Sequence, residues 1–203
     1  MANGRVAVLG GTFDPPHLGH LVLGECARWQ FDCERVLFVP AGDPYRKTGT
    51  GTAENARVAP SERRQVTPGP VRLALVEAAV AGNPAFVADG REVRRPGPSY
   101  TVDTLEELHR EGLDDLVLVV GSDAAADLPN WREPGRIREL ARVVVAEKPG
   151  TPVPAGFEVV EMPRMGVSST LVRAWVREGR PIRYLVPEGV EAIIRAQGLY
   201  REG

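Results

Sequence analysis

Short apolar runs rich in Val and Leu alternate along the chain with longer stretches in which apolar and polar residues recur at helical spacing. The short runs predict β-strands at 5–9, 35–39, 116–120, 142–146 and 157–161. The longer stretches predict helices at 18–31, 71–82, 102–111, 168–178 and 188–197. Strands that alternate with helices favour a doubly wound, mainly parallel sheet. We therefore expect the α/β class, with a small helical part at the C-terminal end.

Residues 47–70 interrupt this alternation. The segment has no sustained apolar period and is rich in Gly, Thr, Pro and Arg. Such a composition is typical of a flexible surface loop, and a substrate lid is the functional alternative. As a lid, the segment would bring Arg57, Arg63 and Arg64 to the substrates.

The composition fits one compact domain over residues 1–203. With 43% apolar residues the chain can bury a sizeable core, and a net charge of −2 argues against non-specific nucleic-acid binding. Cys26 and Cys33 lack metal-ligand spacing and are interpreted as reduced packing residues. The longest strongly apolar run, at 116–120, is too short to span a bilayer. We expect a cytoplasmic protein that binds neither membranes nor nucleic acids.

The segment GGTFDPPHLGH, residues 10–20, lies at the first strand-to-helix turn. In an open α/β sheet such a turn presents unpaired N–H groups and the positive end of a helix dipole, which attract phosphate. His17 and His20 are three residues apart, so both rings can donate to one anion. Glycines at 10, 11 and 19 leave room where a Cβ would obstruct a ligand. The plainer alternative is a tight turn with two solvated histidines, but the chain has three histidines in total and two share this turn.

A dinucleotide-binding oxidoreductase is the obvious rival. It would require G-x-G-x-x-G at the start of the helix and an acidic residue about 20 positions later. Two prolines and two histidines stand there instead.

A second helix start, GVSSTLVRAW at 166–175, carries three hydroxyls and an arginine. Ser168 or Ser169 can cap the helix, and Thr170 and Arg173 complete a possible anion site. Taken alone, the segment is better explained as a plain N-cap with a surface arginine. Two such starts in one small domain favour a triphosphate, which needs more than one group of donors.

These two segments together resemble the paired signature of the nucleotidyltransferases whose histidine motif is related to that of class I aminoacyl-tRNA synthetases. More narrowly, the chain resembles the bacterial nicotinate-nucleotide adenylyltransferases. The resemblance extends over nearly the whole chain, through FVPAGDPYRK (38–47), GPSYTVDTL (97–105), GSDAAADLPNW (121–131) and YLVPEGVEAIIRAQGLY (184–200). It implies a Rossmann-like nucleotidyltransferase fold and adenylyl transfer from ATP to nicotinate mononucleotide.

The resemblance also implies roles for individual residues. His17, His20 and Arg173 would be catalytic. The residues implied to bind ATP are Gly10, Gly11, Thr12, Phe13, His17, His20, Gly121, Asp123, Ser168, Ser169, Thr170 and Arg173. Those implied to bind the mononucleotide are Arg46, Lys47, Tyr100, Thr101, Trp131 and Arg132. Plainer alternatives remain, namely a solvated cationic turn at 46–47, a helix N-cap at Asp123 and a core aromatic at Trp131. The segment after Lys47 is longer than the family pattern.

This chemistry explains why no catalytic triad or carboxylate pair is visible. A phosphate nucleophile is already anionic at pH 7, so positioning and preorganised donors are what the reaction needs. Mg²⁺ is implied as the companion of ATP, without a dedicated carboxylate cage in the sequence. Transfer to nicotinamide mononucleotide or another phosphate, and a non-catalytic ATP sensor, are the alternatives. A homo-oligomer also stays open.

Overall fold

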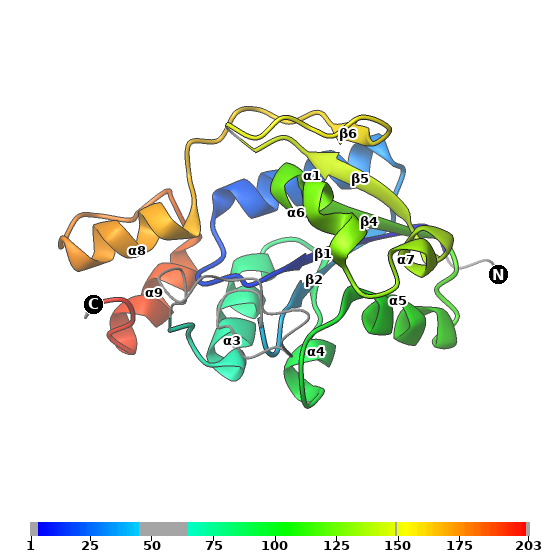
Figure 1. Ribbon diagram of the computed structural model, residues 1–203. Helices are drawn as coiled ribbons and strands as arrows, with labels where there is room; N and C mark the ends of the chain where they lie inside the picture. Colours follow the sequence, from blue (N-terminus) through cyan, green and yellow to red (C-terminus); the bar gives the residue numbers. More distant parts are fainter. Residues whose placement is uncertain (1–3, 45–64, 149, 202–203) are drawn as a thin grey trace.

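A computed structural model describes residues 4–44, 65–148 and 150–201 (Figure 1). Six strands form one sheet in the order β3-β2-β1-β4-β5-β6, and every neighbouring pair is parallel. The strands are β1 (Val6–Gly11), β2 (Arg35–Pro40), β3 (Phe86–Ala88), β4 (Leu116–Gly121), β5 (Arg142–Ala146) and β6 (Glu158–Val160). The predicted doubly wound α/β fold is confirmed.

The described helices connect or follow these strands. They are α1 (Leu18–Gln30), α3 (Gly69–Val80), α4 (Arg91–Arg94), α5 (Thr101–Arg110), α6 (Ser122–Asp127), the 3₁₀-helix η2 (Leu128–Asn130), α7 (Pro134–Leu140), α8 (Ser169–Arg177) and α9 (Glu188–Ala196).

The central strands are apolar throughout because helices cover both faces of the sheet. Alternate residues of β1 lie on opposite faces of the sheet. Val6 and Val8 belong to the apolar cluster under α5 and α7, whereas Ala7 and Leu9 belong to the cluster under α1 and α3. Both clusters are closely packed against the strands, so the ends of β1 and β4 are held in fixed positions.

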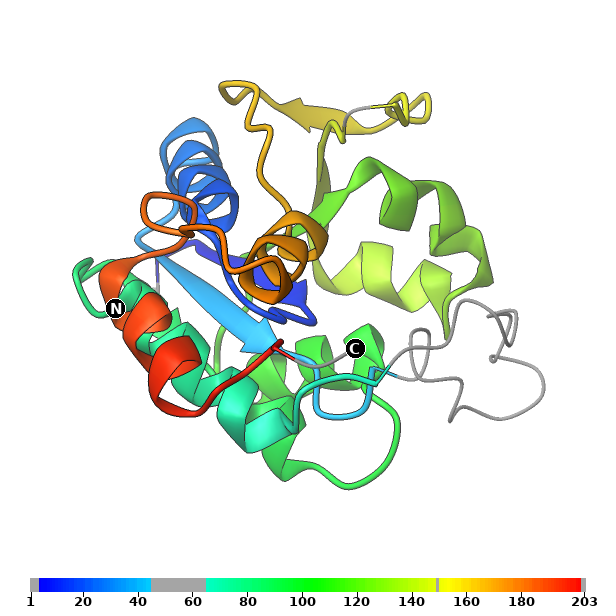
Figure 2. The same ribbon diagram turned by 90° about the vertical axis from the view of Figure 1, so that its left-hand side faces the viewer.

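A third apolar cluster joins the C-terminal helices to α3 rather than to the sheet. Leu75 and Ala79 of α3 pack with Val172 of α8 and with Val190 and Ile194 of α9. Figures 1 and 2 both show α9 lying alongside α3. The predicted small C-terminal helical part is therefore present, and it places α8 beside the end of β1.

The predicted strands and helices are all observed, with ends that differ by at most about two residues. The sequence reasoning did not predict β3, α4, α6, η2 or α7, which are too short for a period to emerge. Of the predicted loop at 47–70, residues 47–64 lie outside the described residues. Its last two residues are helical, because α3 begins at Gly69 and accommodates Pro70 in its first turn. None of the helices in the described ranges has the length and apolar character needed to cross a bilayer.

We predict that Gly24→Ala destabilises the protein. A Cβ at Gly24 of α1 would lie 2.9 Å from Phe38 and 3.0 Å from Phe86, two rings in the core. Overpacking costs about 1–3 kcal/mol, which exceeds the gain of about 1 kcal/mol in helix propensity. Urea unfolding measures the change. Gly135→Ala in α7, where a Cβ meets nothing within 4 Å, is the matched control and should be neutral or stabilising. A Gly24→Ala variant as stable as the control would contradict this packing.

Candidate active site

Strands β1 and β4 are neighbours at the centre of the sheet, and the chain continues from them toward opposite edges. In open α/β sheets, ligands bind in the crevice at the carboxyl ends of such a strand pair. Gly10 and Gly11 end β1, and Gly121 ends β4. The structure thus places two of the segments predicted to bind ATP on either side of this point.

The second residue of the loop from β1 to α1 has a strained backbone conformation. Phe13 has φ of 49°, in the left-handed region that non-glycine residues rarely adopt. The Phe13 ring is buried and lies so close to Gly11 that a Cβ there would be 3.0 Å from it. The rings of Phe13 and His20 pack edge to face, with their centroids 5.0 Å apart. A Cβ on Gly10 would meet no atom within 4 Å. The loop is therefore fixed from beneath by an aromatic side chain, while the space beside Gly10 is open.

The two predicted histidines lie together. Their rings stack with centroids 3.7 Å apart, and a Cβ on Gly19 would lie 3.1 Å from the His17 ring, so glycine makes this arrangement possible. The backbone N–H of His17 donates to Nδ1 of His20 at 3.1 Å. Because Nδ1 accepts, the proton of a neutral His20 is on Nε2, which makes that nitrogen a donor. Burial lowers the pKa of His17 to about 4, so its ring is neutral at pH 7.

The expectation of unpaired N–H groups at the start of α1 is only partly met. The N–H of Leu18 donates to the carbonyl of Leu185 at 2.9 Å, and those of His17 and His20 are also engaged. Side chains must therefore supply much of the anion binding that sequence reasoning assigned to the helix start.

The second predicted segment meets the first. Ser168 caps α8 by accepting from the N–H of Leu171 at 3.1 Å, and Ser169 donates from Oγ to the carbonyl of Pro15 at 2.8 Å. The sequence left both serines open as the cap, and the structure assigns it to Ser168.

Arg173 reaches the same loop from the next turn of α8. Its Nη1 donates to the carbonyl of Asp14 at 2.7 Å, and its Nη2 donates to Oγ1 of Thr170 at 3.2 Å. Two segments about 150 residues apart in the chain are thus in direct contact, and their joint binding of a triphosphate stays a prediction.

Sequence reasoning missed the buried pair formed by Asp14 and Tyr200. The Asp14 side chain is 1% exposed and accepts from the Tyr200 hydroxyl at 2.8 Å. Burial and the neighbouring carboxylate raise the pKa of Tyr200. The chain beyond α9 therefore helps to hold the β1–α1 loop. The one signal in the sequence was that Tyr200 ends the segment 184–200, which is among the segments that resemble the family.

Asp123 lies in the first turn of α6, directly after β4. Its Oδ2 accepts from Nζ of Lys148 at 2.7 Å, and its Oδ1 accepts from the N–H of Ala124 at 3.0 Å. Partial burial favours the neutral acid, but the lysine outweighs it and the pKa of Asp123 is lowered. The carboxylate is therefore ionised at pH 7 and able to accept from hydroxyl groups.

Two of the segments predicted to bind the mononucleotide, those of Tyr100 and Trp131, also come together. Tyr100 precedes α5 and Thr101 begins it, while Trp131 and Arg132 follow η2. The Arg132 guanidinium lies 4.9 Å from the centre of the Tyr100 ring and 3.4 Å from Asp103. Trp131 packs at the margin of the core, and its buried indole N–H has no hydrogen-bond partner among the residues that the structure describes. The core interpretation of Trp131 thus describes part of its surroundings, and the platform interpretation stays a prediction.

The predicted phosphate contacts Arg46 and Lys47 lie outside the described residues, as do Arg57, Arg63 and Arg64 of the predicted lid.

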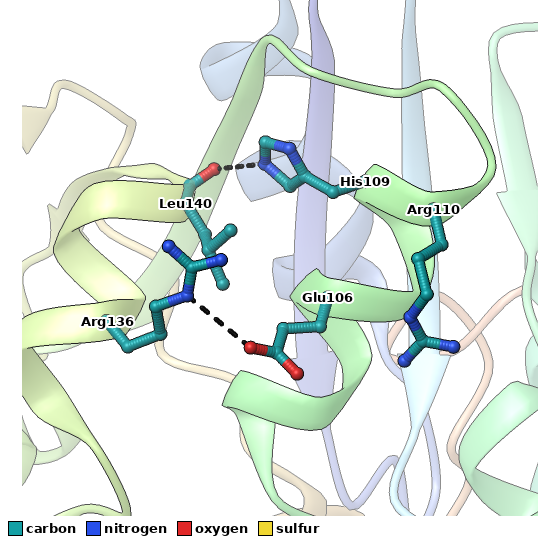
Figure 3. Close-up of a pocket in the computed structure, with 5 residues that line it drawn as sticks. All are labelled: Glu106, His109, Arg110, Arg136 and Leu140. Carbon is teal, nitrogen blue, oxygen red and sulfur yellow. Dashed lines mark hydrogen bonds and ion pairs between the residues drawn. The ribbon is translucent and has the colours of Figure 1, made fainter.

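Within the described ranges, no group of three or more His, Cys, Asp or Glu side chains is arranged to hold a metal ion. A cavity of about 370 Å³ lies elsewhere, between α5 and α7 (Figure 3). It is lined by Glu106, His109, Arg110, Arg136 and Leu140. Glu106, His109 and Arg110 belong to the C-terminal half of α5, and Leu140 is the last residue of α7. This cavity contains none of the predicted site residues.

Comparisons with known proteins agree with this geometry. A family model described as cytidylyltransferase-like matches residues 8–175. A probable nicotinate-nucleotide adenylyltransferase of Roseiflexus sp. is 43% identical, over 99% of this chain and the full length of the relative. Its counterpart in Thermomicrobium roseum is 42% identical, over 97% of this chain and 92% of the relative.

Solved structures show the same fold at lower identity. The nicotinic acid mononucleotide adenylyltransferase of Plasmodium falciparum complexed with APC has a TM-score of 0.71 at 13% identity. The same protein complexed with NaAD has a TM-score of 0.70 at 14% identity. Each comparison covers 97% of both chains.

We predict that His17 makes the folded protein sensitive to acid. Its pKa is about 4 in the folded state against an ordinary value of 6.5, so the unfolded chain binds this proton first as the pH falls. The free energy of unfolding should therefore decrease by about 3 kcal/mol between pH 7 and pH 4 through this group alone. Urea titrations at both pH values measure it. His17→Gln should lose that much less stability on acidification than wild type. Equal losses in the two proteins would show that His17 is not buried in its neutral form.

Proposed function

Since the chain belongs to the cytidylyltransferase-like family and, within it, to the nicotinate-nucleotide adenylyltransferases, we infer that it is an enzyme that transfers the adenylyl group of ATP to nicotinate mononucleotide. The products are nicotinate adenine dinucleotide and pyrophosphate, and the reaction contributes to NAD biosynthesis. The observation that carries the inference is the meeting of the histidine loop and the start of α8 at the carboxyl ends of β1 and β4.

The reaction needs no protein nucleophile. The 5′-phosphate of the mononucleotide attacks the α-phosphorus of ATP, a new P–O bond forms, and the bond to the β-phosphate breaks as pyrophosphate leaves. The protein has to align two polyanions and neutralise the charge that moves to the leaving group. Donors fixed before the substrates arrive do this with little reorganisation.

We assign the ATP phosphates to the residues around the β1–α1 loop. His20 offers Nε2–H, because the backbone of His17 holds its other ring nitrogen as an acceptor. Arg173 lies beside the same loop, with Ser169 and Thr170 next to it. The ionised Asp123 suits the ribose hydroxyls of the adenosine.

Nucleotidyltransferases of this kind generally use a divalent metal with ATP. We propose Mg²⁺, entering as the MgATP complex. The described residues offer no cluster of ligands for it, so the phosphate oxygens of the substrate would provide most of its coordination.

The pyridine ring belongs, in this proposal, between the segments of Tyr100 and Trp131. Thr101 is the first residue of α5, so its N–H has no carbonyl partner within the helix. Such a group can donate to a carboxylate but cannot accept from an amide. The site should therefore favour the acid form of the ring.

We predict that His20→Ala lowers kcat by roughly 10²-fold, the usual effect of losing one preorganised donor. Pyrophosphate release from ATP and nicotinate mononucleotide is the measurement. His109→Ala is the matched control. His109 belongs to α5, and its Nε2 contacts the carbonyl of Leu140 at the end of α7 at 2.8 Å. A folded His20→Ala variant with the turnover of the control would remove His20 from the catalytic set.

We predict that nicotinate mononucleotide exceeds nicotinamide mononucleotide by at least roughly tenfold in kcat/KM, since one mismatched buried donor costs about 1–3 kcal/mol. The same assay, run with a panel of mononucleotides, measures the ratio and tests the function itself. Trp131→Ala should weaken both substrates alike, because stacking does not distinguish acid from amide. Equal kcat/KM values would refute the donor argument, whereas ATP binding without pyrophosphate release from any mononucleotide would indicate a sensor.

A further inference from the structure

Arg72 is a fully buried arginine that the proposed reaction does not use directly. It lies in the first turn of α3 with 1% exposure. A buried charge is costly unless its donors are satisfied. Nε donates to the carbonyl of Thr67 at 2.7 Å, Nη1 to that of Thr12 at 2.9 Å, and Nη2 to that of Gly42 at 3.1 Å.

The three carbonyls belong to three separate segments. Thr12 follows β1 and begins the loop that carries the histidines, Gly42 follows β2, and Thr67 precedes α3. The guanidinium is planar and rigid, and its donors diverge at fixed angles. One side chain therefore ties the β1–α1 loop to the segment after β2, beside the hydrogen bond from the N–H of Ala41 to the carbonyl of Gly11 at 2.9 Å.

The segment after β2 is joined in turn to the segment that carries Tyr100 and Thr101. The N–H of Gly42 donates to Oγ of Ser99 at 2.9 Å, and the N–H of Ser99 donates to the carbonyl of Asp43 at 3.2 Å. The backbone at Gly42 is packed closely against α4, because a Cβ there would lie 2.0 Å from the carbonyl oxygen of Glu92. A displacement at Thr12 is thus opposed by contacts that continue through Gly42 to Ser99.

We propose that Arg72 is a positioning residue that holds the ATP side of the site at a fixed distance from the mononucleotide side. This inference rests on the proposed adenylyl transfer. Alignment of the attacking phosphate with the α-phosphorus depends on both sides at once, and a misplacement of about 1 Å can cost about 10²-fold in rate. Binding of either substrate alone depends on one side only, so it does not require the separation to be exact.

Lysine cannot replace Arg72 in this role. Its ammonium is a compact charge on a flexible stem, and it cannot match three carbonyls arranged around a planar fork. Arg72→Lys keeps the positive charge and removes the geometry, so it tests the separation and not the charge.

The experiment compares Arg72→Lys with wild type in the pyrophosphate-release assay and in calorimetric titrations with each substrate alone. We expect kcat to fall by at least about tenfold, with each KM and each Kd within about threefold of wild type. Arg91→Lys is the matched control. Arg91 is also largely buried, but it pairs with Asp89 and Glu111 away from the three segments. Its kcat should stay near the wild-type value.

Ser99→Ala provides a second, milder variant in case Arg72→Lys does not fold. It removes the acceptor for the N–H of Gly42 without placing a new group in the core, and it should lower kcat with little change in either KM. Unchanged kcat in a folded Arg72→Lys variant, or in Ser99→Ala, would overturn the inference. So would a parallel loss of kcat and of binding to each substrate alone. A wild-type protein that releases no pyrophosphate would overturn the proposed function and this inference with it, whereas an active wild type with an unaffected variant overturns the inference alone.

Discussion

The loop between β1 and α1 is held by hydrogen bonds from distant side chains to its backbone carbonyls, and the rest of the site depends on this constraint. The carbonyls of Thr12, Asp14 and Pro15 accept from Arg72, Arg173 and Ser169 respectively. In the proposed function, a carbonyl oxygen that faced the ATP phosphates would be unfavourable, because its partial negative charge would be repelled by them. Each of these three oxygens is instead occupied by a donor of the protein.

The third apolar cluster contains the helices that supply these donors. Helix α9 packs along α3, which itself supplies Arg72, and Val172 of α8 belongs to the same apolar cluster. The arrangement brings Ser169 and Arg173 to the loop from one side and Arg72 from another. Packing in this cluster thus helps to hold the backbone of the loop that precedes His17 and His20, as the proposed function requires of a preorganised site.

The sequence predicted the elements that carry a strong period and missed those that do not. Continuous apolar runs such as 116–120 have no common alternative to a buried strand in an alternating α/β chain. By contrast, β3 has three residues, and α7 follows Glu133, whose left-handed φ of 51° gives no sequence signal. Both helix starts were found from their donors. Their contact with each other depends on the tertiary fold, which local patterns do not encode.

The residues that position the site were harder to find than those predicted to bind. Asp14 and Arg72 are charged and lie in segments with prolines and glycines, where a solvated surface position is the usual expectation. Their burial follows from partners 186 and 60 residues away. The stretch VRLALVEAAV contains two charged residues, Arg72 and Glu77, and nothing local distinguishes the buried arginine from the exposed glutamate.

The contacts of Asp14 with Arg173 and Tyr200 also determine when the site can form. The β1–α1 loop is synthesised early, but α8 and the tyrosine that bind it come about 155 and 186 residues later. At roughly 5–20 residues per second, a nascent chain carries this loop for roughly 8 to 30 seconds before Ser169 and Arg173 have been made. During that time the loop lacks the hydrogen bonds that Ser169 and Arg173 make to it, although a ribosome-bound fragment can already contain the complete sheet.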